Sequence, residues 1–246
     1  MNFSQGWIVP AWPAPPCVGT LVTTRHGGVS QSPYDSLNLG AHVGDNPVHV
    51  AENRRRLTSC LPRPPVWLSQ VHGTDIVAAE AASNAARADG TVTSRTELPC
   101  AILVADCLPV LFCNTAGSRI GAAHAGWRGL SAGVLEQTVK AMNTDPEQLL
   151  VFLGPAIGPR AFEVGSEVRD VFIADDASAN SAFRPAAVGG KYFANLYALA
   201  KLRLMRMGVT HIYGEEMCTV SDSARFFSYR RDGVTGRMAA VIWLKA

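Results

Sequence analysis

The chain has 246 residues, of which 48% are hydrophobic and 17% are charged, and its formal net charge at pH 7 is +2. This length is enough for one large domain or two small ones, and so small a net charge gives no indication of a nucleic-acid partner. No apolar run approaches the roughly 18 residues that suggest a membrane span. From the small charge and the short apolar runs we expect neither a nucleic acid nor a membrane among its partners.

The amino terminus and the cysteines favour a cytoplasmic protein. The opening segment MNFSQGWIVPAWPAPPC has no basic region followed by an apolar one, so we expect no secretory signal peptide. The six cysteines are scattered, and none forms a Cys-x-x-Cys pair. This pattern is typical of reduced thiols rather than of a disulfide framework, a zinc ribbon or an iron–sulfur site.

Short runs rich in β-branched or aromatic residues, bounded by Gly, Pro or Asp, predict the strands. In chain order they span 17–24, 66–72, 75–80, 100–106, 108–113, 119–125, 149–154, 211–216, 225–231 and 237–244. Helices are predicted over 46–61, 130–142, 164–173 and 193–207. Strands outnumber helices and do not alternate strictly with them, which argues against a βαβ barrel. We therefore expect an α/β (α+β) fold, a mixed sandwich with helices on its outer faces, in one domain over residues 1–246.

Three of these runs each carry one side chain suited to binding a metal. The residues are His72 in LSQVHGTDIV, Cys107 in VADCLPVLF and His124 in GAAHAGWRGL. Imidazole nitrogen and thiolate sulfur suit zinc, and three protein ligands leave a fourth position open. The long spacing fits a catalytic site assembled from separate strands. The alternative is that each is a plain core residue, because a lone His or Cys in an apolar strand usually is.

Glycines and carboxylates flank these three residues. Gly73 and Gly126 follow the two histidines closely and let backbone or ligand approach. Asp75 and Asp106 are candidates to accept a histidine N–H or to relay protons. Asp106 fits equally well as a turn residue that ends a strand.

Two further stretches carry arginines. Arg25 lies in the glycine-rich segment TTRHGGVSQSPYDSLNLG, whose backbone N–H groups suit an anion such as phosphate, although the segment lacks the ending of a Walker A motif. The alternative is that this stretch is an ordinary loop. In FFSYRRDGVTGR, Arg230 and Arg231 are adjacent on a predicted strand, so that at most one of them would face a site.

In their order along the chain, eight blocks together resemble the YfiH family, also known as the multicopper polyphenol oxidoreductase or laccase-domain family. They are TTRHGGVS, SLNLGAHVGD, LSQVHGTDIV, RADGTVT, ADCLPVLF, HAGWRGL, LGPAIGP and FFSYRRDGVTGRMAAVIWL. The resemblance runs almost end to end. It implies a single-domain, multilayered α/β sandwich similar to the catalytic domain of the cytotoxic necrotizing factors. It also implies a zinc site, with copper as the other metal to consider, at His72, Cys107 and His124.

The resemblance further implies an enzyme that is both a transferase and a hydrolase. Its expected activities are phosphorolysis of adenosine, inosine and methylthioadenosine, and deamination of adenosine. The expected partners are therefore the purine nucleoside and phosphate, with the protein a monomer or a weak homodimer. The expected catalytic residues are Cys107, Asp106, Asp75 and Arg25. The expected substrate-binding residues are Arg25, which would hold phosphate, His26, Asn38, Arg128 and Tyr229.

Four other functions stay open at the level of sequence. Some bacterial members of the family are described as peptidoglycan editing factors that remove L-serine from a UDP-MurNAc precursor. A copper polyphenol oxidase would need a separate copper cluster rich in histidine, and the chain has six histidines with no His-x-His pair. Cys107 could act as a thiol nucleophile with His124 or His72 as its base. A purely structural zinc normally has four protein ligands, and these blocks offer no fourth Cys or His.

Overall fold

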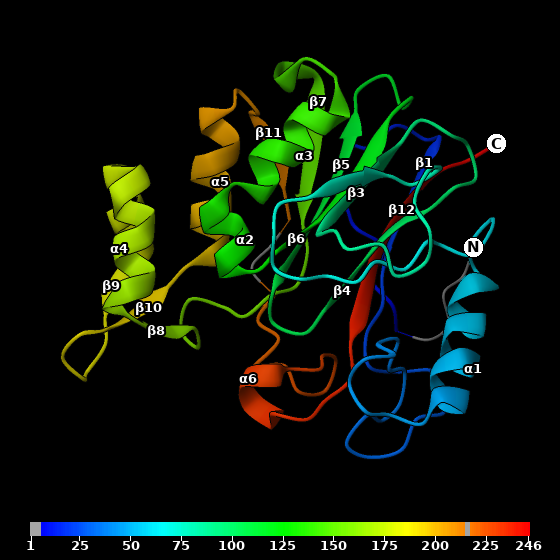
Figure 1. The fold of residues 1–246 in the computed structure, drawn as a ribbon, viewed down its shortest axis with the longest axis horizontal. Helices are drawn as coiled ribbons and strands as arrows, with labels where there is room; N and C mark the ends of the chain where they lie inside the picture. Colours follow the sequence, from blue (N-terminus) through cyan, green and yellow to red (C-terminus); the bar gives the residue numbers. More distant parts are fainter. Residues whose placement is uncertain (1–5, 215–216) are drawn as a thin grey trace.

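The computed structural model describes residues 6–214 and 217–246 and shows a mixed α/β architecture with three sheets (Figure 1). The largest sheet has the strand order β11 (His211–Tyr213), β7 (Leu149–Leu153), β5 (Leu108–Asn114), β6 (Ile120–Ala125), β3 (Gly90–Thr93), β2 (Ile76–Ala78). A second sheet has the order β1 (Val18–Val22), β12 (Met238–Leu244), β4 (Cys100–Val104). A small third sheet has the order β8 (Glu163–Gly165), β10 (Lys191–Ala194), β9 (Phe183–Pro185). The pairs β11–β7 and β2–β3 are parallel, and the others are antiparallel.

Helices cover the outer faces of the two larger sheets, as the strand-rich pattern predicted. They are α2 (Trp127–Ala132), α3 (Val134–Met142) and α5 (Leu196–Arg206) on the large sheet and α1 (Pro47–Thr58) on the second. Helix α4 (Ser166–Asp175) packs against the third sheet, and the short α6 (Tyr229–Asp232) precedes β12. Two 3₁₀ segments span Pro146–Gln148 and Ala177–Ala182. No helix within the described ranges is long and apolar enough to cross a membrane.

The alternating side chains of β5 show how the layers stack. Val110 and Phe112 belong to the core formed with α2, α3 and α5, whereas Leu111 and Cys113 face the core shared with the β1–β12–β4 sheet. All four side chains are fully buried, and each such apolar group contributes roughly 1.5–3 kcal/mol to folding. Burial on both faces explains why this strand reads as a continuous apolar run in the sequence.

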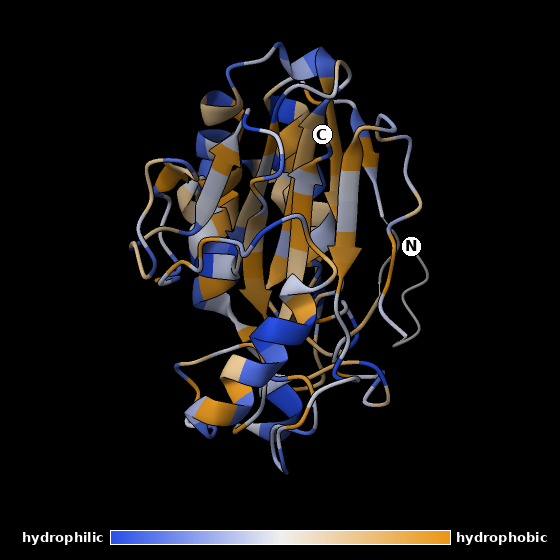
Figure 2. Cartoon of the chain, turned by 90° about the vertical axis from the view of Figure 1, so that its right-hand side faces the viewer, coloured by the Kyte–Doolittle hydropathy of each residue, from blue (hydrophilic) through white to orange (hydrophobic). Residues whose placement is uncertain are grey.

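The second sheet is buried on both faces in the same way. Ile242 of β12 packs toward the large sheet, and its neighbours Val241 and Trp243 pack with Leu57 of α1. The order of layers is therefore helices, six-stranded sheet, three-stranded sheet and α1 (Figure 1). The strands are largely orange in the hydropathy colouring of Figure 2, as expected for strands inside such a sandwich.

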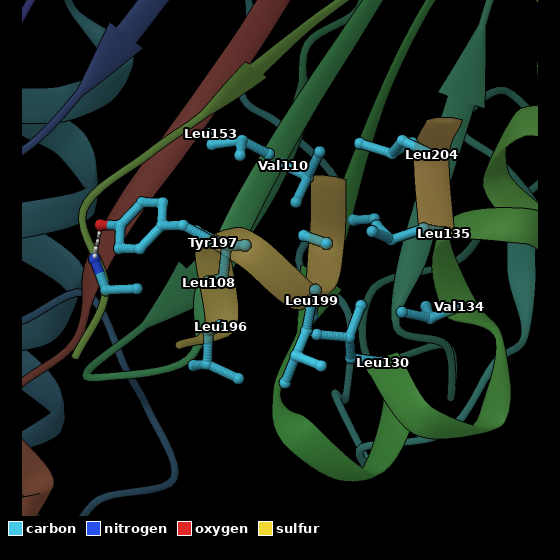
Figure 3. Packing of buried hydrophobic residues seen from close by; sticks show 14 of the residues in the cluster. Leu108, Val110, Leu130, Val134, Leu135, Leu153, Leu196, Tyr197, Leu199 and Leu204 are labelled. Carbon is cyan, nitrogen blue, oxygen red and sulfur yellow. Dashed lines mark hydrogen bonds between the residues drawn. The ribbon is translucent and has the colours of Figure 1, made fainter. Parts of the chain in front are cut away.

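Leucine side chains from α2, α3 and α5 interlock with those of the large sheet in the first core (Figure 3). Tyr197 of α5 belongs to this core, and its hydroxyl accepts a hydrogen bond from Ala156 N at 2.9 Å. Because the phenol oxygen has a polar partner, the ring can be buried without an unsatisfied group.

Two of the predicted strands are wrong. Over 66–72 the structure has an irregular segment with a single bridge at Ser69, because the following backbone N–H groups bind a carboxylate instead of a neighbouring strand. Over 225–231 it has a turn and α6, which begins after Ser228, whose side chain accepts from Arg231 N. Strand β3 and the third sheet were not predicted.

Several predicted elements have different limits. The predicted helix over 130–142 is two helices, α2 and α3, because Gly133 adopts a φ of 101° between them. The predicted helices over 164–173 and 193–207 each begin with a short strand, β8 or β10. In the second case the helix starts after Asn195, whose side chain caps it by accepting from Ala198 N. The last two positions of the predicted strand 211–216 lie outside the described residues.

Candidate metal centre

The structure brings His72, Cys107 and His124 together. One ligand atom from each lies within 4.8 Å of the other two, and His72 Nε2 is 3.7 Å from Cys107 Sγ. The two imidazole rings meet edge to face, with centroids 4.7 Å apart. Among the described residues this is the one group of three or more His, Cys, Asp or Glu side chains with such geometry.

Each of the three residues arrives from a different part of the fold. His124 is in β6 and is fixed by pairing with β3 and β5. Cys107 lies in the tight turn where the chain leaves β4 in the second sheet and enters β5 in the first. His72 lies in the irregular segment before β2 and has a φ of 59°, which is uncommon for a residue with a side chain. A left-handed residue persists only where its surroundings hold it.

Asp89, just before β3, holds the backbone of the His72 segment in this conformation. Its side chain is fully buried, and it accepts hydrogen bonds from the backbone N–H groups of Val71 (3.1 Å), His72 (2.9 Å) and Gly73 (2.7 Å). The same carboxylate lies 2.8 Å from His124 Nδ1. Burial alone would raise the pKa of Asp89, but the hydrogen bonds from His124 and the backbone lower it below its usual value. One carboxylate therefore sets both the path of the His72 segment and the orientation of the His124 ring.

Cys107 and His124 shift each other's pKa in opposite directions. Burial would raise the pKa of the Cys107 thiol, but the adjacent His124 and His72 lower it below its ordinary value. Burial would lower the pKa of His124, whereas Cys107 and Asp89 raise it. The pair thus favours a thiolate, the form of cysteine that binds metals.

The donor set fits a metal ion. Two imidazole nitrogens and one thiolate are ligands that zinc and copper accept, and Asp89 holds the far nitrogen of His124, as carboxylates commonly do for metal-binding histidines. Packing around the ligands is tight. A Cβ at Gly126 would lie 2.8 Å from Cys107 Sγ and 2.9 Å from His72 Cδ2. Glycine at 126 is required for the three ligands to approach one another.

A cavity of about 640 Å³ opens over the three ligands. It lies within the range of ~300–1,000 Å³ that is typical of small-molecule sites. Its walls combine apolar and aromatic side chains with basic ones. They are formed by His42, Gln70, His72, Leu103, Val104, Ala105, Asp106, Cys107, His124, Trp127, Arg128, Ile157, Phe162, Leu196, Tyr229, Arg230 and Arg237.

Asp106 joins the turn at Cys107 to two other segments. Its φ is 87°, and its carboxylate accepts hydrogen bonds from Thr219 Oγ1 (2.6 Å) and from Arg230 N (2.6 Å). Its carbonyl oxygen accepts from Ile157 N (2.9 Å). These contacts fix the turn that presents Cys107 to the cavity.

Some of the other predicted site residues line the cavity and some do not. Arg128 and Tyr229 are in its wall, as are Asp106 and the three ligands. The predicted residues outside its lining are Arg25, His26, Asn38 and Asp75.

Those four residues are placed as follows. The Arg25 guanidinium donates to Asp35 O (2.9 Å) and to Ser223 O (3.0 Å) and pairs with the Asp35 carboxylate. Asn38 is fully buried and bonds to the backbone of neighbouring segments, including Arg237 N. His26 and Asp75 are exposed.

Sequence reasoning gave no role to Asp89, His42 or Arg237. Asp89 lies in the RADGTVT block, where a charged residue directly precedes a run that is buried in the structure, and that position was the available signal. Arg237 lies just before β12, whose first residue, Met238, pairs with Val104 at the end of β4. His42 lies in an irregular segment that has no distinguishing pattern.

Comparison with known proteins gives consistent matches over nearly the whole chain. The family model described as multi-copper polyphenol oxidoreductase laccase matches residues 19–245. The purine nucleoside phosphorylase PA4543 of Pseudomonas aeruginosa is 56% identical over 98% of this chain and 99% of its own. The purine nucleoside phosphorylase YfiH of Escherichia coli is also 56% identical, over 96% and 98% of the two chains. The crystal structure of Neisseria meningitidis protein NMB0706 superposes with a TM-score of 0.96 at 49% identity, covering 98% of this chain and all of that one.

Proposed function

The chain belongs to the multi-copper polyphenol oxidoreductase laccase family, and from that membership together with the site we propose that it is a metal-dependent purine nucleoside phosphorylase. The observation that carries the proposal is the convergence of His72, Cys107 and His124 at a cavity large enough for a nucleoside. Relatives at 56% identity bear the same enzyme name. We propose zinc as the metal and adenosine, inosine and methylthioadenosine as substrates, in a single-domain cytoplasmic enzyme.

The walls of the cavity suit a purine nucleoside. Trp127, Phe162 and Tyr229 offer aromatic surfaces on which a purine ring can stack. Ile157 and Leu196 add apolar contacts that exclude water from the base. Basic side chains on the same walls provide for an anionic co-substrate.

In the proposed reaction a phosphate oxygen attacks C1′ of the ribose. The C1′–N9 bond breaks, its electron pair leaves with the purine, and the purine takes up a proton to give the free base and ribose 1-phosphate. His72, Cys107 and His124 would hold the metal, which supplies Lewis acidity when bound. We assign Asp106 a positioning role, because both of its carboxylate oxygens already accept hydrogen bonds that fix the turn at Cys107.

Deamination of adenosine at the same cavity is the second activity we propose. Water replaces the amino group at C6, and ammonia is released together with inosine. Asp89 keeps the His124 ring oriented in both reactions, because its carboxylate is hydrogen-bonded to Nδ1.

One observation favours a second candidate function, a thiol-dependent hydrolase. Asp89 is hydrogen-bonded to His124, and a ring nitrogen of His124 lies within 4.8 Å of Cys107 Sγ, which is the order of groups found in cysteine nucleophile triads. This chemistry and metal binding need the same thiolate, so one excludes the other in a given molecule.

The variant Cys107→Ala tests whether metal binding and phosphorolysis both depend on the Cys107 thiolate. We expect the variant to lose both bound metal and the production of ribose 1-phosphate from inosine and phosphate. Cys60→Ala is the control, because Cys60 is a partly buried thiol outside the cavity. Phosphorolysis that survives in Cys107→Ala without metal would refute the proposal. Activity that survives removal of the metal but disappears on alkylation of Cys107 would support the hydrolase instead.

A further inference from the structure

The charged side chains that line the cavity are mostly basic. Arg128, Arg230, Arg237 and His42 are basic groups in its wall in addition to the two ligand histidines. Among the described lining residues Asp106 is the single carboxylate, and its oxygens are occupied by Thr219 and the backbone of residue 230. A cleft lined by one sign of charge attracts ligands of the opposite sign.

The three arginines differ in what they have free to offer. Arg230 Nη1 donates to Glu163 O at 3.0 Å, which ties α6 to β8. Arg128 is exposed and lies over the ring of Trp127, with its guanidinium carbon 4.4 Å from the centroid. Arg230 is exposed like Arg128, whereas Arg237 is half-buried and anchored through Nη1, so Arg237 is the best placed of the three to hold a ligand inside the cavity.

That anchor leaves the useful edge of Arg237 open. Nη1 donates to Thr235 O and Gly236 O, both at 3.0 Å, and the aliphatic stem packs over Gly40. Within the described ranges neither Nε nor Nη2 has a hydrogen-bond acceptor. These two nitrogens carry the parallel N–H bonds that bind a carboxylate or a phosphate in bidentate fashion. The guanidinium is thus held in place with its anion-binding edge unused.

Two further basic residues, His42 and Arg54, lie near Arg237: His42 lines the same cavity, and Arg54 donates to Leu39 O while Leu39 N donates to Arg237 O. Burial and the positive charges of Arg237 and Arg54 lower the pKa of His42, so His42 offers a neutral imidazole to a ligand. The Arg54 guanidinium donates to Leu39 O at 2.9 Å and stacks on Trp67, so its position is fixed. Arg237 and Cys107 line the same cavity, which opens over the candidate metal centre.

We propose that Arg237, with His42 beside it, forms the phosphate-binding subsite of this cavity. The inference deepens the proposed function, on which it rests for its choice of ligand, because phosphorolysis needs a phosphate next to the nucleoside. It replaces Arg25 as the phosphate ligand, because the nitrogens of Arg25 already donate to Asp35 and Ser223. The phosphate is either free inorganic phosphate or a phosphate group carried by the nucleoside.

Titration calorimetry of the full-length, metal-loaded protein with inorganic phosphate tests the subsite directly. Arg237→Gln should raise the Kd for phosphate by about tenfold to a hundredfold, because it removes a charge-assisted bidentate contact. Arg237→Lys, which keeps the charge but loses the fork, should fall between the wild type and Arg237→Gln. His42→Asn should weaken phosphate binding by a smaller factor. The His42 side chain makes no hydrogen bond in the described structure, so the substitution should leave the fold intact.

The control is Arg184→Gln, since Arg184 is exposed on β9, stacks on Phe193 and lies outside the cavity. Its phosphate affinity should equal that of the wild type. Thermal unfolding of each variant checks that the fold is retained. Wild-type phosphate affinity in Arg237→Gln and His42→Asn, or an equal loss in Arg184→Gln, would overturn the proposal.

Two further measurements identify the source of the phosphate and separate this inference from the proposed function. If the ligand is inorganic phosphate, Arg237→Gln raises KM for phosphate by the same factor as Kd and leaves KM for inosine nearly unchanged. If the phosphate is carried by the nucleoside, adenosine 5′-monophosphate binds more tightly than adenosine, and Arg237→Gln removes that difference. Phosphate binding that depends on Arg237 in a protein without phosphorolysis would leave the subsite standing and refute the proposed function.

Discussion

Asp89→Asn is the substitution that most directly perturbs the metal centre without removing a ligand. The carboxylate accepts three backbone N–H groups and is hydrogen-bonded to His124 Nδ1, with two contacts on each oxygen. An amide keeps one of these oxygens, so at least two donors would face an NH₂ group. Each charge-assisted hydrogen bond contributes roughly 1.5–3 kcal/mol, so losing two should lower the free energy of unfolding by about 3–6 kcal/mol. Zinc affinity should fall by about 10–100-fold, the usual effect of losing such a supporting carboxylate.

The assay combines zinc competition against a chromogenic chelator with urea unfolding of the metal-free protein. Asp75→Asn is the matched control, because Asp75 is an exposed aspartate of the same segment whose side chain has no hydrogen bond in the described structure. The pKa of Asp89 is lowered in the fold, so its stabilising effect is complete above its ordinary value of about 3.9 and declines as pH falls through the lowered pKa. Asp89→Asn should remove that part of the acid sensitivity. Wild-type zinc affinity in Asp89→Asn, or an equal loss in Asp75→Asn, would refute the reasoning.

Two further predictions concern the cysteines and the packing around the site. Gly126→Ala should abolish or strongly weaken metal binding while the chain still folds, because the new Cβ would overlap Cys107 and His72. Metal titration measures the loss of binding and circular dichroism checks the fold. Wild-type zinc affinity in this variant would contradict the prediction. In the metal-free folded protein, iodoacetamide should modify Cys107 at pH values below the ordinary thiol pKa of about 8.5, and the rate should fall only as pH drops through its lowered pKa. Burial raises the pKa of Cys100 and of Cys113 to about 12, so peptide mass spectrometry should find both unmodified unless the chain unfolds.

The grouping of His72, Cys107 and His124 could be predicted from the sequence because each residue breaks a local pattern. His72, Cys107 and His124 are polar or reactive side chains in apolar runs, at the places where strands were expected to begin or end. Cys107 lies in the turn that leads into β5, and His124 lies in β6. Because β5 and β6 pair in one sheet, the two residues come together. The mixed α/β class followed from the same strand-rich pattern.

Asp89 could not be recognised in the same way, because its role depends on contacts between distant segments. Its partners at 71–73 and at 124 are separated from it by 16 to 18 and by 35 residues. The same partners explain why the predicted strand over 66–72 is absent, since its last N–H groups are directed to a carboxylate.

Arg25 shows the opposite situation. Its glycine-rich surroundings are typical of an anion site, but an acceptor 198 residues away in the sequence, Ser223 O, binds its guanidinium. The open guanidinium edge is that of Arg237, a residue to which the sequence analysis assigned no role. Local pattern identifies residues capable of binding phosphate, and the fold decides which of them is free to do so.

The central claim is that one metal held by His72, Cys107 and His124 is required for phosphorolysis of purine nucleosides. Elemental mass spectrometry of the purified protein, with ribose 1-phosphate production from inosine and from adenosine assayed on the same sample before and after chelation, tests it most directly. We predict about one zinc per chain, loss of turnover with the metal, and recovery when zinc is returned. Full turnover in metal-free protein would contradict the claim.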